Sequence, residues 1–299
     1  FGDFIGMSSS LNGFYKLFKD DFERKINECS EKRNLNKIFS DIVSNNNTAD
    51  LMSFLFSLES NAQLRKRGER ISLSKELSEN YEVKIVFLLF YSAVMFYIAN
   101  LFKKRNLAAP GYITFSGTAS KILKIIGSIE SIQELTNVIF AQLMNSSQRI
   151  ELKTVENPKE ITCKGGLKMT AEDMSSHPDK EYFFGVPELD SNDIPLADKD
   201  VIYTESNKEK VLTLYKEFVS FFFSLNNKFS FSEHFGIEDN NGIFEQYKSI
   251  LTEHCEQDFA TVFDDRIGDF QPTEKFQDSL FFYPLSGGIF RLTQFISNN

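Results

Sequence analysis

Two short runs of alternating apolar and polar positions interrupt a chain that otherwise follows helical periodicity. Tyr112–Ser116 (YITFS) alternates and is rich in β-forming residues, and residues 149–155 (RIELKTV) repeat that pattern. The helix expected between them carries its apolar residues on one side, at Ile122, Leu123, Ile125 and Ile126. The pattern therefore predicts a strand, a helix and a second strand in the middle of the chain.

Helical stripes dominate on both sides of these strands. Helices are expected at about 11–32 and 51–60, and residues 207–227 carry a stripe at Val211, Leu214, Tyr215, Phe218, Phe222 and Leu225. A further helix is predicted over 241–259 (NGIFEQYKSILTEHCEQDF). The last apolar stretch, 279–296, contains Pro284 and Gly287-Gly288, and we expect these residues to break it.

One segment is apolar enough to cross a bilayer. Residues 85–102 (IVFLLFYSAVMFYIANLF) hold no charge over about the length of a membrane span. Ser92 and Asn100 interrupt the segment, and Tyr91 and Tyr97 lie inside it rather than at its ends. We expect residues 83–104 to form a buried helix of a soluble protein, with no membrane as partner.

Composition narrows the class of protein. The 299 residues suffice for two ordinary domains, and 41% apolar and 25% charged residues are typical of a globular protein. With 32 Phe and no Trp, much of the core must consist of phenyl rings. The net charge of −9 comes from the part after residue 110, which argues against nucleic acid as a partner. The basic residues Arg65-Lys66-Arg67 and Arg70 are interpreted as a solvated loop or helix face.

Cysteine and histidine positions indicate neither zinc nor a disulfide framework. Cys29, Cys163 and Cys255 are far apart and odd in number, so the reducing cytoplasm is the expected compartment. His254 is adjacent to Cys255, a spacing that points the two side chains to different helix faces. His254 is therefore expected to be structural or exposed.

The turn after the first strand, Ser116-Gly117-Thr118, is the candidate binding site. A strand that ends there and enters a helix offers free backbone N–H groups. Gly117 lets a ligand lie against bare backbone, and Thr118 or Ser120 can cap the helix or contact a hydroxyl. Most turns of this kind only connect a strand to a helix, and that structural alternative stays open here.

A second motif, NPKEITCKGGL (157–167), follows the second strand. It resembles the closing segment of the ATPase domain in large heat-shock chaperones, and YITFSGTASKI resembles the adenosine motif of actin, those chaperones and bacterial actin homologues. The order of long helix, strand, glycine turn, helix and strand also fits. The chain is thus similar to the actin-like (ribonuclease-H-like) ATPase superfamily over about residues 1–175.

The resemblance implies a site and a cofactor. Ser116, Gly117 and Thr118 would lie against the nucleoside of ATP, with Ser120 and Lys121 at the start of the helix beyond. The closing pair Gly165-Gly166 would let the last helix pack beneath the nucleotide. A helix of the small lobe would lean on the adenine; Glu23 and Lys25 could contact it, or belong to a solvated helix face.

Departures from the family are as informative as the likeness. Ser116-Gly117 stands where the family prefers two glycines, and Lys159 stands where the chaperones have an acidic residue. No strand–Asp–x–Gly–x–Thr loop, which would hold Mg²⁺ and the phosphates, is present. The opening FGDFIG sits where the family resumes after its second phosphate loop. We therefore expect the C-terminal portion of such an ATPase, inactive in hydrolysis by itself and dependent on its intact parent for Mg²⁺.

The predicted architecture is a helix-rich α/β fold, a partial actin-like ATPase fold (its second domain) followed by a mostly α-helical C-terminal region. The ATPase portion would span residues 1–178, with a helical small lobe at about 11–80 and an α/β part at about 81–178. The helical domain would span 179–299.

Two other functions remain open on the sequence. A scaffold or protein-interaction module could keep the fold without using nucleotide, and its Phe-rich helices after residue 205 would then bind a protein partner. An enzyme with its own acidic site at Asp258, Asp264 and Asp265 has less support, because no His or metal spacing accompanies these carboxylates.

Overall fold

The computed structural model describes four main stretches of the chain: residues 77–116, 122–154, 205–267 and 280–299. It also describes Ser120 and a few positions between 24 and 41. Several predictions therefore lie outside the described residues: nearly all of the small lobe, the closing motif at 157–167 and the domain boundary near residue 178. Those predictions remain untested.

Helix α7 (Tyr81–Lys104) is the central element of the described fold. It begins because the Asn80 side chain accepts hydrogen bonds from the N–H groups of Glu82 (2.9 Å) and Val83 (3.1 Å). Lys103 and Lys104 lie in its last turn, where they complement the helix dipole. Most of its side chains from Val83 onward are buried. The sequence prediction of a buried helix over 83–104 is confirmed.

Strands β1 (Tyr112–Phe115) and β2 (Glu151–Thr154) form a parallel pair. The register joins Tyr112 to Glu151 and Phe115 to Thr154, so both carboxyl ends lie at one edge of the sheet. The two predicted strands are confirmed, each slightly shorter than expected. Within the described residues the fold is thus helix-rich α/β with a small parallel sheet.

The segment between the strands holds two helices, where the sequence indicated one. Helix α8 (Ile122–Ile126) ends before Gly127, whose bare Cα faces the Phe235 ring closely enough that a Cβ would lie 3.0 Å from it. Ser128 then caps helix α9 (Ile129–Met144) by accepting a hydrogen bond from Ser131 N–H (3.1 Å). The predicted inner residues Leu123, Ile125 and Ile126 are buried. A local capping signal therefore divided an otherwise continuous apolar pattern.

The described residues of the C-terminal region, 205–267 and 280–299, are mostly helical, as expected. Its long elements are α12 (Glu205–Leu225), α14 (Ile243–Glu253), α15 (Cys255–Ile267) and α16 (Phe282–Asn298), and its short ones are α13 (Phe231–Phe235) and the 3₁₀ turn η3 (Asn240–Gly242). The stripe predicted on α12 is buried except for Leu214, which is partly buried. The helix expected over 241–259 is instead α14 and α15, separated at His254, whose φ of −117° is not helical.

The prediction that Pro284 and the glycine pair break the last helix is wrong. Pro284 is the third residue of α16, where a backbone N–H would have no intrahelical acceptor in any case. Gly287 and Gly288 lie inside the helix, where they face Asp258 and Tyr215 at very close range. A Cβ on Gly288 would come within 2.5 Å of the Tyr215 hydroxyl, so glycine here serves helix packing rather than a turn.

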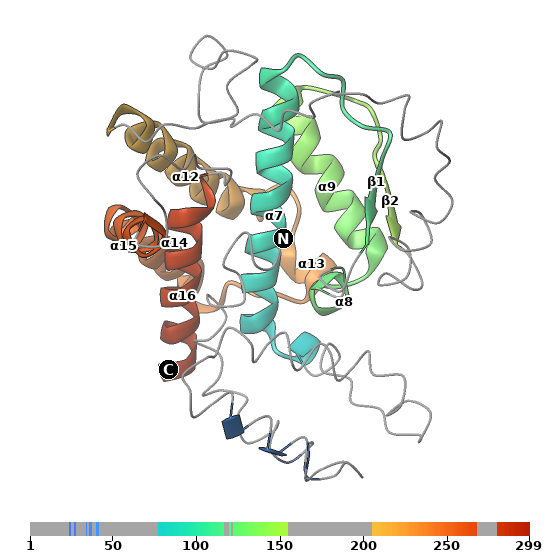
Figure 1. The fold of residues 1–299 in the computed structure, drawn as a ribbon. Coiled ribbons are helices and arrows are strands. Elements are labelled where there is room, and N and C mark those ends of the chain that lie inside the picture. The colour runs from blue at the N-terminus through green and yellow to red at the C-terminus, as the bar shows by residue number, and fades with distance from the viewer. Residues whose placement is uncertain are drawn as a thin grey trace, which may run out of the picture.

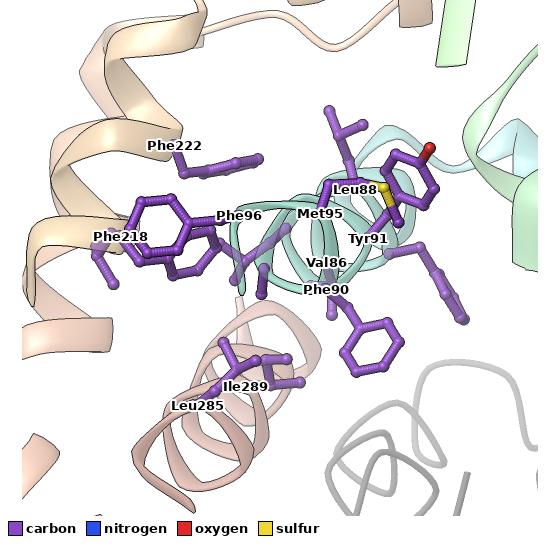
Figure 2. Close-up of a cluster of buried hydrophobic side chains, with 14 of the residues drawn as sticks. Val86, Leu88, Phe90, Tyr91, Met95, Phe96, Phe218, Phe222, Leu285 and Ile289 are labelled. Carbon is purple, nitrogen blue, oxygen red and sulfur yellow. The ribbon is translucent and has the colours of Figure 1, made fainter. Parts of the chain in front are cut away.

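Helix α7 is shared by both halves of the described structure. Figure 1 shows α9 and the strands on one side of it and α12, α14 and α16 on the other. Phe96 of α7 packs against Phe218 of α12 (ring centroids 5.3 Å apart) and Phe281 (6.1 Å). Figure 2 shows Phe96 and Phe218 near Leu285 and Ile289 of α16. One hydrophobic cluster therefore connects the α/β part to the helical part.

Candidate functional site

The predicted site residues belong to the connection between β1 and α8. Ser116 directly follows β1 and is exposed, and Ser120 lies half-buried two residues before α8. Gly117, Thr118 and Lys121 lie outside the described residues. The structure thus describes the two ends of the predicted glycine turn and leaves its middle untested.

The carboxyl end of β1, which precedes Ser116, is anchored to the core. Phe115 packs against the Tyr91 ring of α7 with centroids 6.0 Å apart. The Tyr91 hydroxyl is 2.5 Å from Thr136 Oγ1, and Thr136 in turn donates to the Ile132 carbonyl (2.8 Å), so Tyr91 is the donor. Burial raises the pKa of Tyr91, which keeps this donor protonated. The carboxyl end of β1 is therefore held rigidly against α7 and α9.

Two exposed residues with hydroxyl groups lie at the carboxyl end of the sheet. Thr154, the register partner of Phe115, is exposed at the end of β2, and Ser116 is the next residue on β1. Hydroxyl groups there can donate to or accept from a ribose or a base. Helix α8 has only five residues, so it contributes too small a dipole to bind a phosphate. The geometry suits a neutral, hydrogen-bonding ligand group better than an anion.

A second polar group lies between the C-terminal helices. The Arg291 guanidinium of α16 donates to the Asp258 carboxylate of α15, and the side chain of Asp258 is largely buried. Burial raises the pKa of Asp258 to about 6, although Arg291 and His254 act to lower it. The nearby Tyr215 hydroxyl donates to the Leu251 carbonyl (2.9 Å). This group joins α12, α14, α15 and α16 through polar contacts inside an apolar region.

Sequence reasoning considered Asp258 only as a carboxylate without a partner. Its partner Arg291 lies 33 positions later in the chain. No sequence signal joins the two residues, because they come together only when α15 packs against α16, where Gly287 leaves room for Asp258. The described residues contain no group of three or more metal-ligating side chains around this carboxylate or elsewhere. Asp258 and Arg291 form an ion pair that joins α15 to α16.

His254 and Cys255 lie at the junction of α14 and α15. Cys255 is buried with a free thiol, whereas His254 beside it is exposed. Burial raises the pKa of the Cys255 thiol, so it is a poor nucleophile. The expectation that His254 is structural or exposed is confirmed, although His254 lies between two helices rather than inside one.

By length and composition, α7 is the one helix among the described residues that could cross a membrane. Of its most apolar window, 72% is buried inside the protein, which is what a core helix shows. Most of the apolar surface of α7 is thus covered by other parts of this chain.

Comparisons with known proteins give no further guide to identity. No family model matches the chain, and no curated protein or solved structure matches it significantly. The resemblance to actin-like ATPases therefore rests on the residues quoted above.

Proposed function

We propose that this chain carries the adenosine side of an actin-like ATP site, with the nucleoside bound at Ser116, Gly117 and Thr118 and with Ser120 and Lys121 at its rim. Support comes mainly from one observation: exposed Ser116 follows a strand of a parallel pair and leads through Ser120 into a helix. Ligands of open α/β sheets bind at the carboxyl ends of such strands.

The order of elements also supports the proposal. A long helix, α7, precedes β1, and helices precede the parallel partner β2, which is the order that the resemblance implies. The exposed hydroxyl groups of Ser116 and Thr154 fit a ribose or an adenine edge. In the family that the chain resembles, Mg²⁺ and the phosphates are held by Asp–x–Gly–x–Thr loops, and this sequence contains no such loop.

Binding to this side alone is expected to be weak. Without phosphate contacts, the dissociation constant for ATP should be about 1 mM, which corresponds to roughly 4 kcal/mol. At about 10 mM ligand, such binding raises the free energy of unfolding by about 1.4 kcal/mol. Because phosphates contribute little here, adenosine and ATP should stabilise the chain equally, and ATP hydrolysis should be undetectable.

The experiment is a thermal-shift titration with adenosine and with ATP plus Mg²⁺. Gly117→Val places a branched side chain where the nucleoside would lie, so it should abolish the shift in Tm. Gly111→Val is the matched control at the opposite end of β1, where an added Cβ would meet only the Gln148 side-chain nitrogen, at 3.7 Å. It should keep the shift.

Three outcomes would contradict the proposal: no shift for the unchanged chain, an equal shift for the Gly117→Val variant, or hydrolysis by the chain itself. Absence of nucleotide binding would favour the scaffold module. In that case the partner surface would have to be sought outside the α12 stripe, because those phenyl rings are buried. Phe290 is the most exposed Phe in the described part.

A further inference from the structure

The two edges of the β1–β2 sheet can be assigned from the register. In a parallel pair, alternate residues direct their backbone groups toward the neighbouring strand and away from it. Glu151 N–H donates to the Gly111 carbonyl (3.0 Å), which directs Gly111 and Ile113 toward β2. Tyr112 and Thr114 therefore direct their N–H and C=O groups to the outer edge of β1.

The outer edge of β2 is closed by side chains of α9. Asn137 accepts from Ile150 N–H (2.7 Å) and donates to the Ile150 carbonyl (3.1 Å), as the backbone of a neighbouring strand would. Gln133 accepts from Leu152 N–H (2.9 Å). Figure 1 shows α9 running beside the two strands. Another strand cannot pair with β2 without displacing these amides.

The outer edge of β1 has no such cover. In residues 77–154, as far as they are described, no hydrogen bond reaches the outward backbone groups of Tyr112 and Thr114. The side chain of Tyr112 is 63% exposed. Proteins usually protect an open edge with charges, proline or a bulge, and the strand Tyr-Ile-Thr-Phe contains no charge and no proline. The contrast with β2 marks this edge as a place where another strand pairs.

We propose that the strand pairing with β1 is β1 of a second copy, antiparallel, around a twofold axis at Ile113. Tyr112 then faces the partner's Thr114, and Thr114 faces the partner's Tyr112, so both outward residues of each copy exchange backbone hydrogen bonds. Each of these pairs joins an aromatic and a β-branched side chain, a favourable cross-strand combination. The product is a four-stranded sheet whose outermost strands are both closed by α9.

The choice of a second copy rests on self-complementarity. Because no residue of β1 is charged, twofold pairing brings no like charges directly opposite each other, and a charged peptide would find no countercharge on the strand. The nearest cation, Lys153, already lies over the Tyr112 ring (4.8 Å) and near Glu151 (3.6 Å). The strand is four residues long, so the dimer is small and readily dissociates. The dimer is expected to form whether or not nucleotide is bound.

The experiment compares the oligomeric state of the full chain and three variants. Sedimentation is measured from about 5 µM to about 500 µM, the range over which weak dimers dissociate. Thr114→Lys adds a charge at the open edge and should weaken the dimer at least about tenfold. Thr154→Lys adds the same charge at an exposed position of closed β2 and should leave it unchanged, as should the uncharged Thr114→Val.

Hydrogen exchange at Tyr112 and Thr114 provides a second readout. Their amide protection should increase with protein concentration in the unchanged chain and not in Thr114→Lys. A constant monomer mass over the whole range overturns the proposal, and so does a dimer that Thr114→Lys leaves intact. Strong protection of both amides at the lowest concentration also overturns it, because another segment of the same chain would then already cover the edge.

Discussion

Asp258 shows how a single side chain depends on its surroundings at the residue scale. Its raised pKa of about 6 means that burial disfavours the charged carboxylate more than Arg291 favours it. Relative to an unfolded value of 3.8, protonation of Asp258 favours the folded state, so its contribution is present at low pH and is lost as the pH rises toward 6. The Arg291 guanidinium limits that loss.

Replacing Arg291 by Met should make the pH dependence steeper. The buried carboxylate would lose its counter-ion, and the free energy of unfolding at pH 8 should fall by about 2–4 kcal/mol, with a smaller loss at pH 5. Urea unfolding at the two pH values measures this difference. The double variant with Asp258→Asn removes the uncompensated charge and should recover most of the loss at pH 8. Equal losses at both pH values would show that only packing was removed.

At the scale of elements, Gly288 shows how close packing between helices outweighs helix propensity. Alanine has a higher helix propensity than glycine by about 1 kcal/mol, so Gly288→Ala would stabilise an isolated helix. In the folded protein the new Cβ would meet Tyr215 Oη at 2.5 Å and Leu251 Cδ2 at 3.2 Å, which forces α16 away from α12 and α14. We expect a net loss of about 1–3 kcal/mol in the free energy of unfolding, measured by urea denaturation.

Gln294→Ala is the control for this substitution. Gln294 is exposed on the same helix, so the change alters propensity without touching a neighbour and should shift stability by less than about 0.5 kcal/mol. A stabilised Gly288→Ala variant would show that α16 is not packed as closely as the structure describes.

The same elements show what the sequence could predict. The α12 stripe was readable because periodicity alone determines which face of a long helix is buried. The separations at Gly127 and His254 could not be predicted, because each lies inside a stretch whose pattern predicts a single helix, and each depends on a cap or a neighbour. The Asp258–Arg291 pair and the Asn137 contacts with Ile150 join residues whose proximity exists only after the helices have packed. For the candidate site, the strand and its Ser116 were predictable, whereas the glycine turn remains a prediction.

At the scale of the whole molecule, α7 makes the two described halves depend on each other. Its Phe96 and Tyr97 contact phenyl rings of the C-terminal region, and its Tyr91 contacts β1 and α9. The boundary predicted near residue 178 would separate segments that here share one hydrophobic cluster. We expect the described parts to unfold together, because neither half can keep α7 buried alone.

Phe218→Ala tests this dependence. Phe218 is fully buried on α12 between Phe96 of α7 and Phe281, so truncation leaves a cavity and should lower the free energy of unfolding by about 3–5 kcal/mol. Native-state hydrogen exchange should then show lost protection in α9 and β2 as well as in α12, since the loss is transmitted through α7.

The harsher Phe218→Asp should be destabilised by several kcal/mol as well, because it buries an unpaired charge. Phe290→Ala on α16 is the matched control, because its ring is already 38% exposed, and it should cost less than about 1 kcal/mol. If Phe218→Ala reduces protection in the C-terminal helices while α9 and β2 keep theirs, the two halves are independent folding units that merely touch along α7.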